Sequence, residues 1–358
     1  MERLSIGVVG CGAISGIYFQ NFNKFGLRVV ACSDLDSDKA RAAAEKWGVA
    51  RVLSNEDLLR DPEVGVVVNL TVPKAHHEIN MAAIRAGKHV YVEKPMAVER
   101  EEGRQLIEEA TSRNLKVGCA PDTVLGAGIQ TCRKLIDDGE IGQPVGAQAF
   151  MLCPGHESWH PSPEFYYERG GGPMFDMGPY YMTALVTLLG GIRSVAGSAR
   201  VSFPTRTITS EPKRGKVIQV ETPTHISGLL NFENGAVGAI TTSFDVQRST
   251  LPCIEVYGSE GSILVPDPNG FSGPVKLFKK GSDNWREVSL THPYADNSRG
   301  LGVLDLIESV EENRPNRASG ELAFHVLDAM HAILDSSDSG QVIELAGLRT
   351  RDAAMPSA

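Results

Sequence analysis

A glycine-rich loop near the amino terminus offers backbone groups, rather than side chains, for binding. The stretch Gly10-Cys11-Gly12-Ala13-Ile14-Ser15 follows an apolar run and precedes a helical pattern. Glycines in this position let the backbone approach a pyrophosphate that lies on the N-terminus of the following helix. Ser15 takes the place of the third glycine in the G-x-G-x-x-G pattern, and Gly16 follows it. We therefore predict a dinucleotide site whose contacts include Gly10, Gly12, Ala13, Ile14 and Ser15.

A carboxylate, Asp34, ends the second apolar run, 22 residues after Gly12. Dinucleotide-binding folds place there the acidic residue that hydrogen-bonds a ribose 2′-hydroxyl. Because a carboxylate repels a 2′-phosphate, we expect NAD rather than NADP, although Ser33 and Lys39 could weaken that preference. The alternative is a solvated carboxylate beside an ordinary glycine turn. The register of strand, glycines, helix and acid argues against it.

Two more groups of chemically useful residues follow later apolar runs. Thr71-Val72-Pro73 and His76 come after Val64–Leu70, and Glu93-Lys94-Pro95 comes after His89–Val92. Ligands of open parallel sheets bind beyond the carboxyl ends of the strands. A lysine there can polarise a hydroxyl or lower the pKa of a neighbour, although a lone lysine at a strand end is more often only solvated. We expect the cofactor to contact Thr71, Val72, Pro73, His76, Glu93 and Lys94.

The third group lies in the middle of the chain, where Gly170-Gly171-Gly172-Pro173 opens a predicted helix from Met174 to Leu189. Asp176 and Tyr180 are four residues apart, so we expect them on one helix face. The alternative is a helix-end carboxylate and a packed tyrosine. The preceding Gly/Pro-rich loop carries three side chains that are either substrate contacts or loop packing, namely His156, Trp159 and His160.

The first third of the chain alternates short apolar strands with helical patterns, which predicts βαβ units and a parallel sheet with helices on both faces. The valine-dominated run Val64–Leu70 is too short for a buried helix. The expected strands are Leu4–Val9, Arg28–Ser33, Val64–Leu70, His89–Val92 and Leu115–Cys119.

The pattern changes near Pro121, strand patterns dominate after Leu189, and two helices, Leu301–Glu312 and Gly320–Asp335, come near the end. Asn234-Gly235 between two apolar-rich runs is a strong hairpin signal. We predict an α/β protein with an N-terminal dinucleotide-binding Rossmann domain over residues 1–122. A second, α+β domain for substrate binding and oligomerisation spans 123–348, and 349–358 form a tail.

Composition narrows the class of protein further. The 358 residues carry 35 Lys and Arg against 44 Asp and Glu, a net charge of −9, which disfavours nucleic acid or an anionic membrane as partner. Six scattered cysteines show no metal-ligand spacing, so we expect no metal and a reducing compartment. No apolar run approaches the roughly 18 residues of a membrane span. We expect a soluble, cytoplasmic protein.

Together these motifs resemble the Gfo/Idh/MocA oxidoreductase family, over Leu4 to about Asp335. The resemblance rests on G-C-G-A-I-S, Asp34, T-V-P-K-A-H, A-G-K-H-V-Y-V-E-K-P and G-G-G-P-M-F-D-M-G. It implies a Rossmann domain followed by a domain built on a large, open, mostly antiparallel sheet that commonly forms the oligomer interface. It also implies NAD(P)-dependent chemistry on sugars, inositols and related polyols.

Carried over by motif, the resemblance implies catalytic roles for Lys94, Asp176 and position 180. Where the family usually has a histidine, this chain has Tyr180. In this it resembles the branches of glucose-fructose oxidoreductase and dimeric dihydrodiol dehydrogenase. A second departure is Ala120-Pro121-Asp122-Thr123, which lacks the Asn-x-x-Arg-Phe often seen after that strand. Asp122 is therefore our candidate for a cofactor contact in that segment.

The expected activity is hydride transfer between NAD(H) and a secondary alcohol or carbonyl of a carbohydrate-like or polyol substrate. Tyr180 would accept the hydroxyl proton, Lys94 would bind the reacting oxygen and favour the phenolate, and Asp176 would orient substrate hydroxyls. His160 is the rival base, since its imidazole can titrate near neutrality. Redox-neutral glycoside cleavage with NAD, or a non-catalytic sugar sensor, stays open. We expect a homodimer or homotetramer formed through the C-terminal sheet.

Overall fold

The computed structural model describes residues 3–347 and 351–357. The chain divides into two compact units. Unit 1 comprises Met1–Leu125, Asp296–Phe324 and Asp352–Ala354, and unit 2 comprises Gly126–Ala295, His325–Arg351 and Met355–Ala358. Of the expected tail, residues 349, 350 and 358 lie outside the described residues. Residues 351–357 form no helix or strand.

Unit 1 contains a six-stranded parallel sheet in the order β3-β2-β1-β4-β5-β6, which confirms the predicted Rossmann topology. The valines of β4, one of the two middle strands, are fully buried, as expected for a sheet covered on both faces. The carboxyl ends of β1, β4 and β5 therefore meet at one edge of the sheet. The strands are β1 (Ser5–Val9), β2 (Val29–Ser33), β3 (Arg51–Val52), β4 (Val64–Asn69), β5 (His89–Val92) and β6 (Val117–Cys119).

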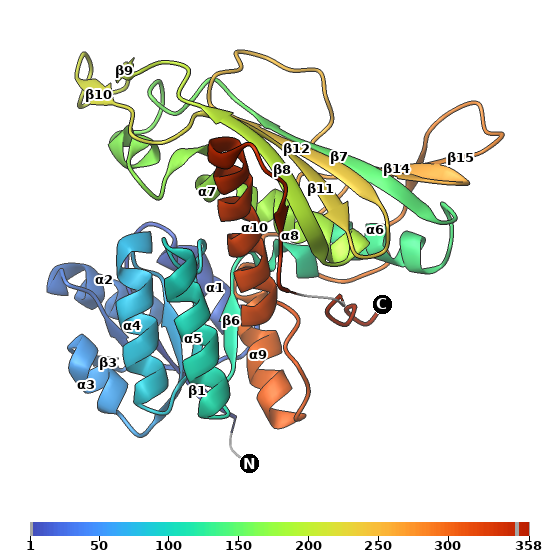
Figure 1. Ribbon diagram of the computed structural model, residues 1–358. Helices are drawn as coiled ribbons and strands as arrows, with labels where there is room; N and C mark the ends of the chain where they lie inside the picture. The colour runs from blue at the N-terminus through green and yellow to red at the C-terminus, as the bar shows by residue number, and fades with distance from the viewer. Residues whose placement is uncertain (1–2, 348–350, 358) are drawn as a thin grey trace. The chain divides into compact units, whose positions relative to one another are not determined.

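The helices of unit 1 begin and end at the local signals that the sequence supplies. Asp36 caps α2 by accepting a hydrogen bond from the Asp38 backbone N–H at 3.0 Å, and Gly48 ends this helix in the left-handed region. Helices α4 and α5 lie side by side (Figure 1). The helices are α1 (Ser15–Lys24), α2 (Ser37–Trp47), α3 (Asn55–Arg60), α4 (Pro73–Arg85), α5 (Arg100–Ser112), the 3₁₀ turn η1 (Asp122–Leu125) and α9 (Leu301–Glu311).

Unit 2 is built on a nine-stranded sheet in the order β16-β15-β14-β13-β7-β12-β11-β8-β17. Strands β7 and β12 pair in parallel and the other pairs are antiparallel, so the expected open, mostly antiparallel sheet is confirmed. These strands are β7 (Pro144–Leu152), β8 (Ile192–Arg200), β11 (His225–Phe232), β12 (Val237–Ser243), β13 (Ile254–Gly258), β14 (Gly261–Val265), β15 (Val275–Lys279), β16 (Arg286–Val288) and β17 (Ile343–Glu344).

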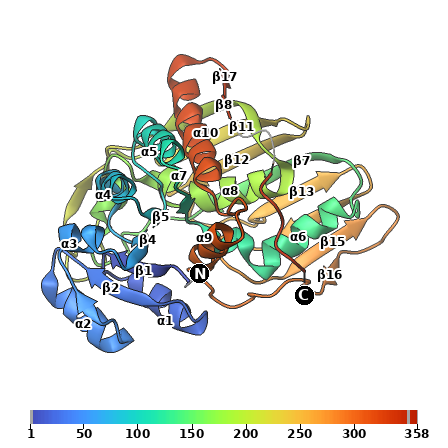
Figure 2. The same ribbon diagram turned by 90° about the horizontal axis from the view of Figure 1, so that it is seen from below.

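Helices cover one face of this sheet. In Figure 2, α8 (Gly178–Leu189) and α6 (Ala127–Asp137) lie across it. Helix α10 (Gly320–Ser339), which begins in unit 1 and continues in unit 2, approaches β8 very closely. A Cβ on Gly197 would lie only 2.1 Å from the Ile333 carbonyl oxygen. Glycine at that position therefore lets the helix backbone touch the strand.

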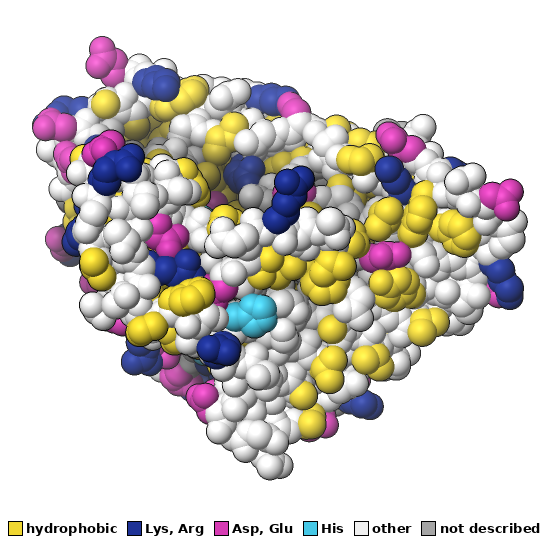
Figure 3. Space-filling model, turned by 90° about the horizontal axis from the view of Figure 1, so that it is seen from above, with side chains coloured by type: hydrophobic (Ala, Val, Ile, Leu, Met, Phe, Trp, Pro, Cys, Tyr) yellow, Lys and Arg dark blue, Asp and Glu magenta, His cyan; other side chains and the backbone are white. Residues whose placement is uncertain are grey.

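The other face of the nine-stranded sheet is open. Strand β11 alternates buried with partly exposed residues, the pattern of a sheet with one covered side. Leu229 on β11 and Val237 on β12 are 56% and 55% exposed. Hydrophobic side chains are spread over the face of the molecule drawn in Figure 3. Among the described residues, no helix is long and apolar enough to cross a membrane.

Candidate functional site

The glycine loop between β1 and α1 leaves no room for a side chain at its first glycine. Gly10 has a φ of +97°, and a Cβ there would lie 2.8 Å from the carbonyl carbon and oxygen of Leu70. Nothing lies within 4 Å of the Cβ position of Gly12, so space is open above the loop. Ser15 Oγ donates to the Gly12 carbonyl at 2.7 Å and stabilises the turn into α1.

Asp34 is fixed beside this loop by two backbone groups. Its Oδ2 accepts a hydrogen bond from the Cys11 N–H at 2.7 Å, and its Oδ1 accepts one from the Asp36 N–H at 2.8 Å. The carboxylate therefore lies at the carboxyl end of β2, next to the glycine loop. This is the placement that the spacing from Gly12 predicted.

Exposed aliphatic side chains belong to the same loops. Leu35, directly after Asp34, is 98% exposed, Val72 is 66% exposed, and Ile14 is also exposed. Single exposed aliphatic residues are ordinary, but several on the loops beside one glycine turn offer the apolar surface that a bound ring needs. Sequence reasoning missed Leu35, and its only signal is an apolar residue inside the polar stretch Ser33–Ser37.

His76 is buried inside unit 1. Its Nδ1 is 2.7 Å from the Pro95 carbonyl oxygen and its Nε2 is 3.1 Å from the Thr71 carbonyl oxygen. Burial lowers the pKa of His76 below its ordinary value. The ring thus links the loop after β4 to the loop after β5. Its nitrogens face the protein backbone, whereas the sequence predicted a cofactor contact.

Thr71 is held in place by Asn69, the last residue of β4. Asn69 Oδ1 accepts hydrogen bonds from the Thr71 Oγ1 at 2.7 Å and from its N–H at 3.2 Å, and Asn69 Nδ2 donates to Asn80 Oδ1 at 2.8 Å. Pro73 follows as the first residue of α4. The buried amide of Asn69 therefore shapes the loop that carries Thr71, Val72 and Pro73.

Asp122 also lies in the interior of unit 1. It is fully buried, and its Oδ2 accepts hydrogen bonds from the N–H groups of Gly300 at 2.8 Å and Gly302 at 3.0 Å, at the start of α9. Burial is the main cause that raises the pKa of Asp122 from 3.8 to about 6; the nearby Glu93 carboxylate adds to the rise, and the two backbone hydrogen bonds oppose it. Its contacts in the structure are those of a helix cap, whereas the sequence suggested a cofactor contact.

In unit 2, Asp176 and Tyr180 do not share one helix as we had predicted. Asp176 ends α7 (Gly172–Asp176), and Tyr180 lies in the first turn of α8, with Met177 between the two helices. Pro179 has no N–H to donate, and the Tyr180 N–H bonds to the Met177 carbonyl at 3.0 Å. The proline therefore divides the predicted helix, and Tyr180 is almost completely buried.

His156 faces Asp176. Its Nε2 lies 3.6 Å from Asp176 Oδ2, and neither ring nitrogen has a hydrogen-bond partner among the described residues. The ring packs against three aromatic rings, with centroid distances of 4.1 Å to Tyr166, 4.6 Å to Phe244 and 5.3 Å to Trp159. The structure thus brings together His156 and Asp176, two of the residues that the sequence singled out.

The other two loop candidates lie in an aromatic cluster. Trp159 is 61% exposed, and its ring meets that of His160 edge-on at 5.3 Å. His160 Nδ1 accepts a hydrogen bond from the Ser162 N–H at 3.0 Å, and its ring packs against Phe165 and Tyr166. Trp159 therefore offers an exposed aromatic face, while His160 has one ring nitrogen committed to its own loop.

A buried ion-pair network, which sequence reasoning missed, holds this loop. Arg206 Nη1 donates to Glu157 Oε1 at 3.0 Å, and Arg206 Nη2 donates to Asp245 Oδ1. Thr224 Oγ1 donates to Asp245 Oδ2 at 2.7 Å, and the guanidinium lies over the Tyr167 ring. These charged residues are far apart in the chain, so no sequence spacing predicts that they pair. They anchor Glu157, the neighbour of His156.

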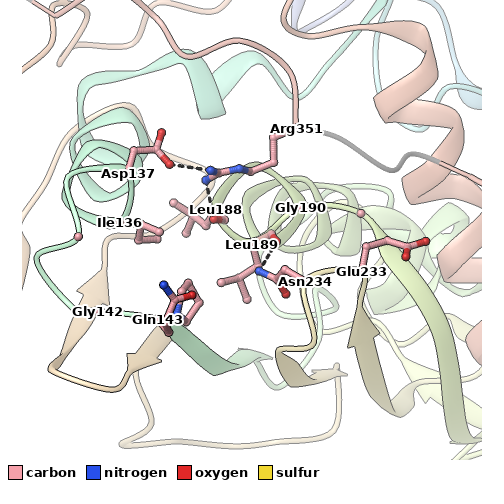
Figure 4. Close-up of a pocket in the computed structure, with 13 residues that line it drawn as sticks. Ile136, Asp137, Gly142, Gln143, Leu188, Leu189, Gly190, Glu233, Asn234 and Arg351 are labelled. Atoms are coloured by element: carbon pink, nitrogen blue, oxygen red, sulfur yellow. Dashed lines mark hydrogen bonds and ion pairs between the residues drawn. The ribbon is translucent and has the colours of Figure 1, made fainter.

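Unit 2 also contains an open cavity of about 610 Å³ at the ends of α6 and α8 (Figure 4). Arg351 Nη2 pairs with Asp137 Oδ1 at 2.6 Å, and its Nη1 donates to the Leu188 carbonyl at 3.0 Å. The cavity is lined by Ile136, Asp137, Gly139, Gly142, Gln143, Pro144, Leu188, Leu189, Gly190, Gly191, Glu233, Asn234 and Arg351. None of the predicted site residues belongs to this lining.

The family of the chain follows from comparison with known proteins. Residues 4–120 match an oxidoreductase family with an NAD-binding Rossmann fold, and residues 129–264 match the Gfo/Idh/MocA C-terminal domain. This is an oxidoreductase with a nicotinamide-dinucleotide domain. The chain belongs to the Gfo/Idh/MocA family, as the resemblance of its motifs predicted.

Individual relatives agree with this assignment. The chain is 35% identical over 302 residues to an inositol 2-dehydrogenase of Klebsiella pneumoniae, covering 78% of this chain and 77% of the relative. It is 28% identical over 243 residues to a 1,5-anhydro-D-fructose reductase of Ensifer adhaerens, covering 67% and 68%. A solved levoglucosan dehydrogenase in complex with NADH superposes with a TM-score of 0.84 over 97% of this chain and 100% of that one, at 19% identity, and shares the fold.

The raised pKa of Asp122 predicts a pH-dependent stability. The folded state binds the Asp122 proton more tightly than the unfolded state, so this proton stabilises the fold. Its contribution to the unfolding free energy is fully present below pH ~4 and is lost as the pH rises through about 6. Asp122→Asn keeps an oxygen for both backbone N–H groups and removes the titration. Between pH ~4.5 and ~7, the unfolding free energy of the wild type should fall relative to this variant by roughly 2 kcal/mol, measured by urea unfolding. Parallel curves for the two proteins would contradict the assignment.

Proposed function

We propose that this protein is an NAD(H)-dependent dehydrogenase that transfers a hydride between the nicotinamide and a secondary alcohol or carbonyl of a sugar-like or polyol substrate. The observation that carries the proposal is the Asp34 carboxylate, fixed by the Cys11 and Asp36 N–H groups beside the open space at Gly12. A ribose hydroxyl and a pyrophosphate fit these groups. The inositol, levoglucosan and anhydrofructose enzymes among the relatives support the substrate class.

The surroundings of Asp34 favour NAD over NADP. Ser33 is buried, and its hydroxyl donates to Asn55 Oδ1, so it does not face a 2′-phosphate. Lys39 pairs with Asp36 at 3.8 Å. A 2′-phosphate would therefore meet the charge of Asp34 beside a lysine that already pairs with another carboxylate. We assign the cofactor contacts to the glycine loop, Asp34 and the loop from Thr71 to Pro73.

We assign proton transfer to the residues that the family motifs mark. When NAD is bound, its nicotinamide supplies the hydride acceptor. Tyr180 takes the substrate hydroxyl proton, and Lys94 binds the same oxygen as a cation. Asp176, with His156 against it at 3.6 Å, orients further hydroxyls, and the exposed ring of Trp159 lies near His156 on the same loop. We therefore assign catalytic roles to Lys94, Tyr180 and Asp176. We assign substrate contacts to His156, Trp159 and His160.

We further propose that the open face of the nine-stranded sheet joins copies of this chain into a homodimer or homotetramer. Leu229 and Val237 are more than half exposed there, and burying such apolar surface favours association.

All six cysteines are free of disulfide bonds, which fits a reducing cytoplasm.

A coupled absorbance assay tests the activity. NAD with a panel of sugars, inositols and glycosides should give NADH in a one-to-one ratio to oxidised product for at least one substrate. Product formation without NADH would indicate redox-neutral glycoside cleavage instead. Binding of NAD and sugar with no turnover across the panel would indicate a sensor. Either result would replace the dehydrogenase assignment.

Asp34→Ala should weaken NAD binding by ~10–150-fold, because a charge-assisted hydrogen bond contributes about 1.5–3 kcal/mol. The same variant should discriminate less against NADP. Asp38→Ala is the matched control, because Asp38 is exposed and pairs with Arg41 on α2. Titration of both variants with NAD and NADP measures the effect. Equal NAD dissociation constants for Asp34→Ala and Asp38→Ala would contradict the cofactor site.

Tyr180→Phe should lower kcat by ~10²–10⁴-fold and leave NAD binding unchanged, because it removes the proton acceptor and keeps the ring. His160→Ala is the companion variant. If Tyr180→Phe turns over normally while His160→Ala is folded, binds NAD and is inactive, the base is His160. Steady-state kinetics on both variants, with NAD titration as the check on folding, separates these outcomes.

A further inference from the structure

Glu93, which precedes the candidate catalytic lysine, uses both carboxylate oxygens inside unit 1. Its Oε1 accepts a hydrogen bond from the Tyr18 hydroxyl at 2.7 Å, and its Oε2 accepts one from the Lys94 backbone N–H at 2.9 Å. Tyr18 lies on α1, the helix that starts at the glycine loop, and Glu93 and Lys94 directly follow β5, which ends at Val92. One carboxylate therefore ties the helix of the cofactor loop to the backbone of Lys94.

The two side chains of this link are buried. Tyr18 is fully buried and Glu93 is almost fully buried. The neighbouring groups are protein side chains, with the Tyr91 ring 6.4 Å from that of Tyr18 and Asp122 close enough to interact with Glu93. A buried carboxylate whose two oxygens accept hydrogen bonds from neighbouring protein groups at normal distances holds those groups in place.

We propose that Glu93 is a positioning residue for Lys94, acting through the two hydrogen bonds that it accepts from the Tyr18 hydroxyl and the Lys94 N–H. This inference rests on the proposed function, in which Lys94 binds the reacting oxygen. The bond to Lys94 N–H fixes the backbone from which the lysine side chain extends. Displacing a catalytic group by about 1 Å costs on the order of 10²-fold in rate. Loss of the link therefore slows the chemical step and spares NAD binding.

The chain offers a matched pair of tyrosines for the test. Tyr18 and Tyr91 are both fully buried and adjacent, but it is the Tyr18 hydroxyl that donates to Glu93. Tyr18→Phe removes the hydroxyl that donates to Glu93, whereas Tyr91→Phe removes a neighbouring buried hydroxyl and leaves the bond from Tyr18 to Glu93 in place. General loosening of the core would affect both variants alike.

A second pair separates hydrogen bonding from charge. Glu93→Ala removes both acceptors. Glu93→Gln keeps an oxygen for the Lys94 N–H, and its amide N–H can donate to the Tyr18 hydroxyl. If Glu93 acts by position, the glutamine variant retains most of the activity that the alanine variant loses.

The experiment measures the NAD dissociation constant, kcat, and the deuterium isotope effect on kcat with substrate labelled at the reacting carbon. Tyr18→Phe and Glu93→Ala should lower kcat by ~10–100-fold, keep NAD binding within ~3-fold and raise the isotope effect as hydride transfer becomes rate-limiting. Tyr91→Phe and Glu93→Gln should stay close to the wild type. If Glu93→Ala does not fold, the tyrosine pair decides alone.

Three outcomes overturn the inference. Equal kcat and isotope effects for Tyr18→Phe and Tyr91→Phe, with Lys94→Ala inactive, reject Glu93 as a positioning residue and leave the proposed function standing. A loss confined to NAD binding in Tyr18→Phe or Glu93→Ala returns Glu93 to the cofactor site. Full turnover by Lys94→Ala removes the catalytic role of Lys94, and the inference falls with it.

Discussion

The close approach of two backbones at Gly10 is the constraint on which the dinucleotide site of unit 1 depends. The carboxyl ends of β1 and β4 lie side by side, and a Cβ on Gly10 would collide with the carbonyl of Leu70. With glycine there, the chain turns so that the Cys11 N–H reaches Asp34 and α1 can start at Ser15. A side chain at that position would separate the loop from β4. The acid, the helix N-terminus and the open space at Gly12 all follow from this one contact.

The polar residues beyond the strand ends divide into two kinds. Asp34 is held by backbone donors beside the glycine loop, whereas His76, Glu93 and Asp122 have their polar atoms committed to interior partners. An unpaired buried polar group lowers the stability of the fold by on the order of 1–3 kcal/mol. The hydrogen bonds of these three side chains therefore each stabilise a particular loop or helix start. These motif residues therefore hold the loops and the helix start around the strand ends.

The candidate residues of unit 2 lie on a long loop and on the two consecutive helices α7 and α8, so they must be positioned by contacts from elsewhere in the unit. The loop is held by the buried pairing of Arg206 with Glu157 and Asp245. Breaking one partner of such a network leaves an uncompensated buried charge, so the loop is fixed more firmly than its glycine and proline content suggests. His156 is consequently held against Asp176 by contacts that come from distant strands.

The sequence by itself determined the parallel sheet, the glycine loop and the place of Asp34, because hydrophobic period, turn residues and short-range spacing are local properties of a chain. The open antiparallel sheet was implied by the resemblance of the motifs to the family. The sequence did not reveal β3 and α3, which are too short to show a period, or the division of one predicted helix into α7 and α8 at Pro179. It also placed Asp296–Phe324 with the second domain, whereas these residues pack within unit 1. Only the tertiary structure decided that Asp122 caps α9 and that Glu157 meets Arg206, because burial and pairing between residues far apart in the chain exist only once the chain is folded.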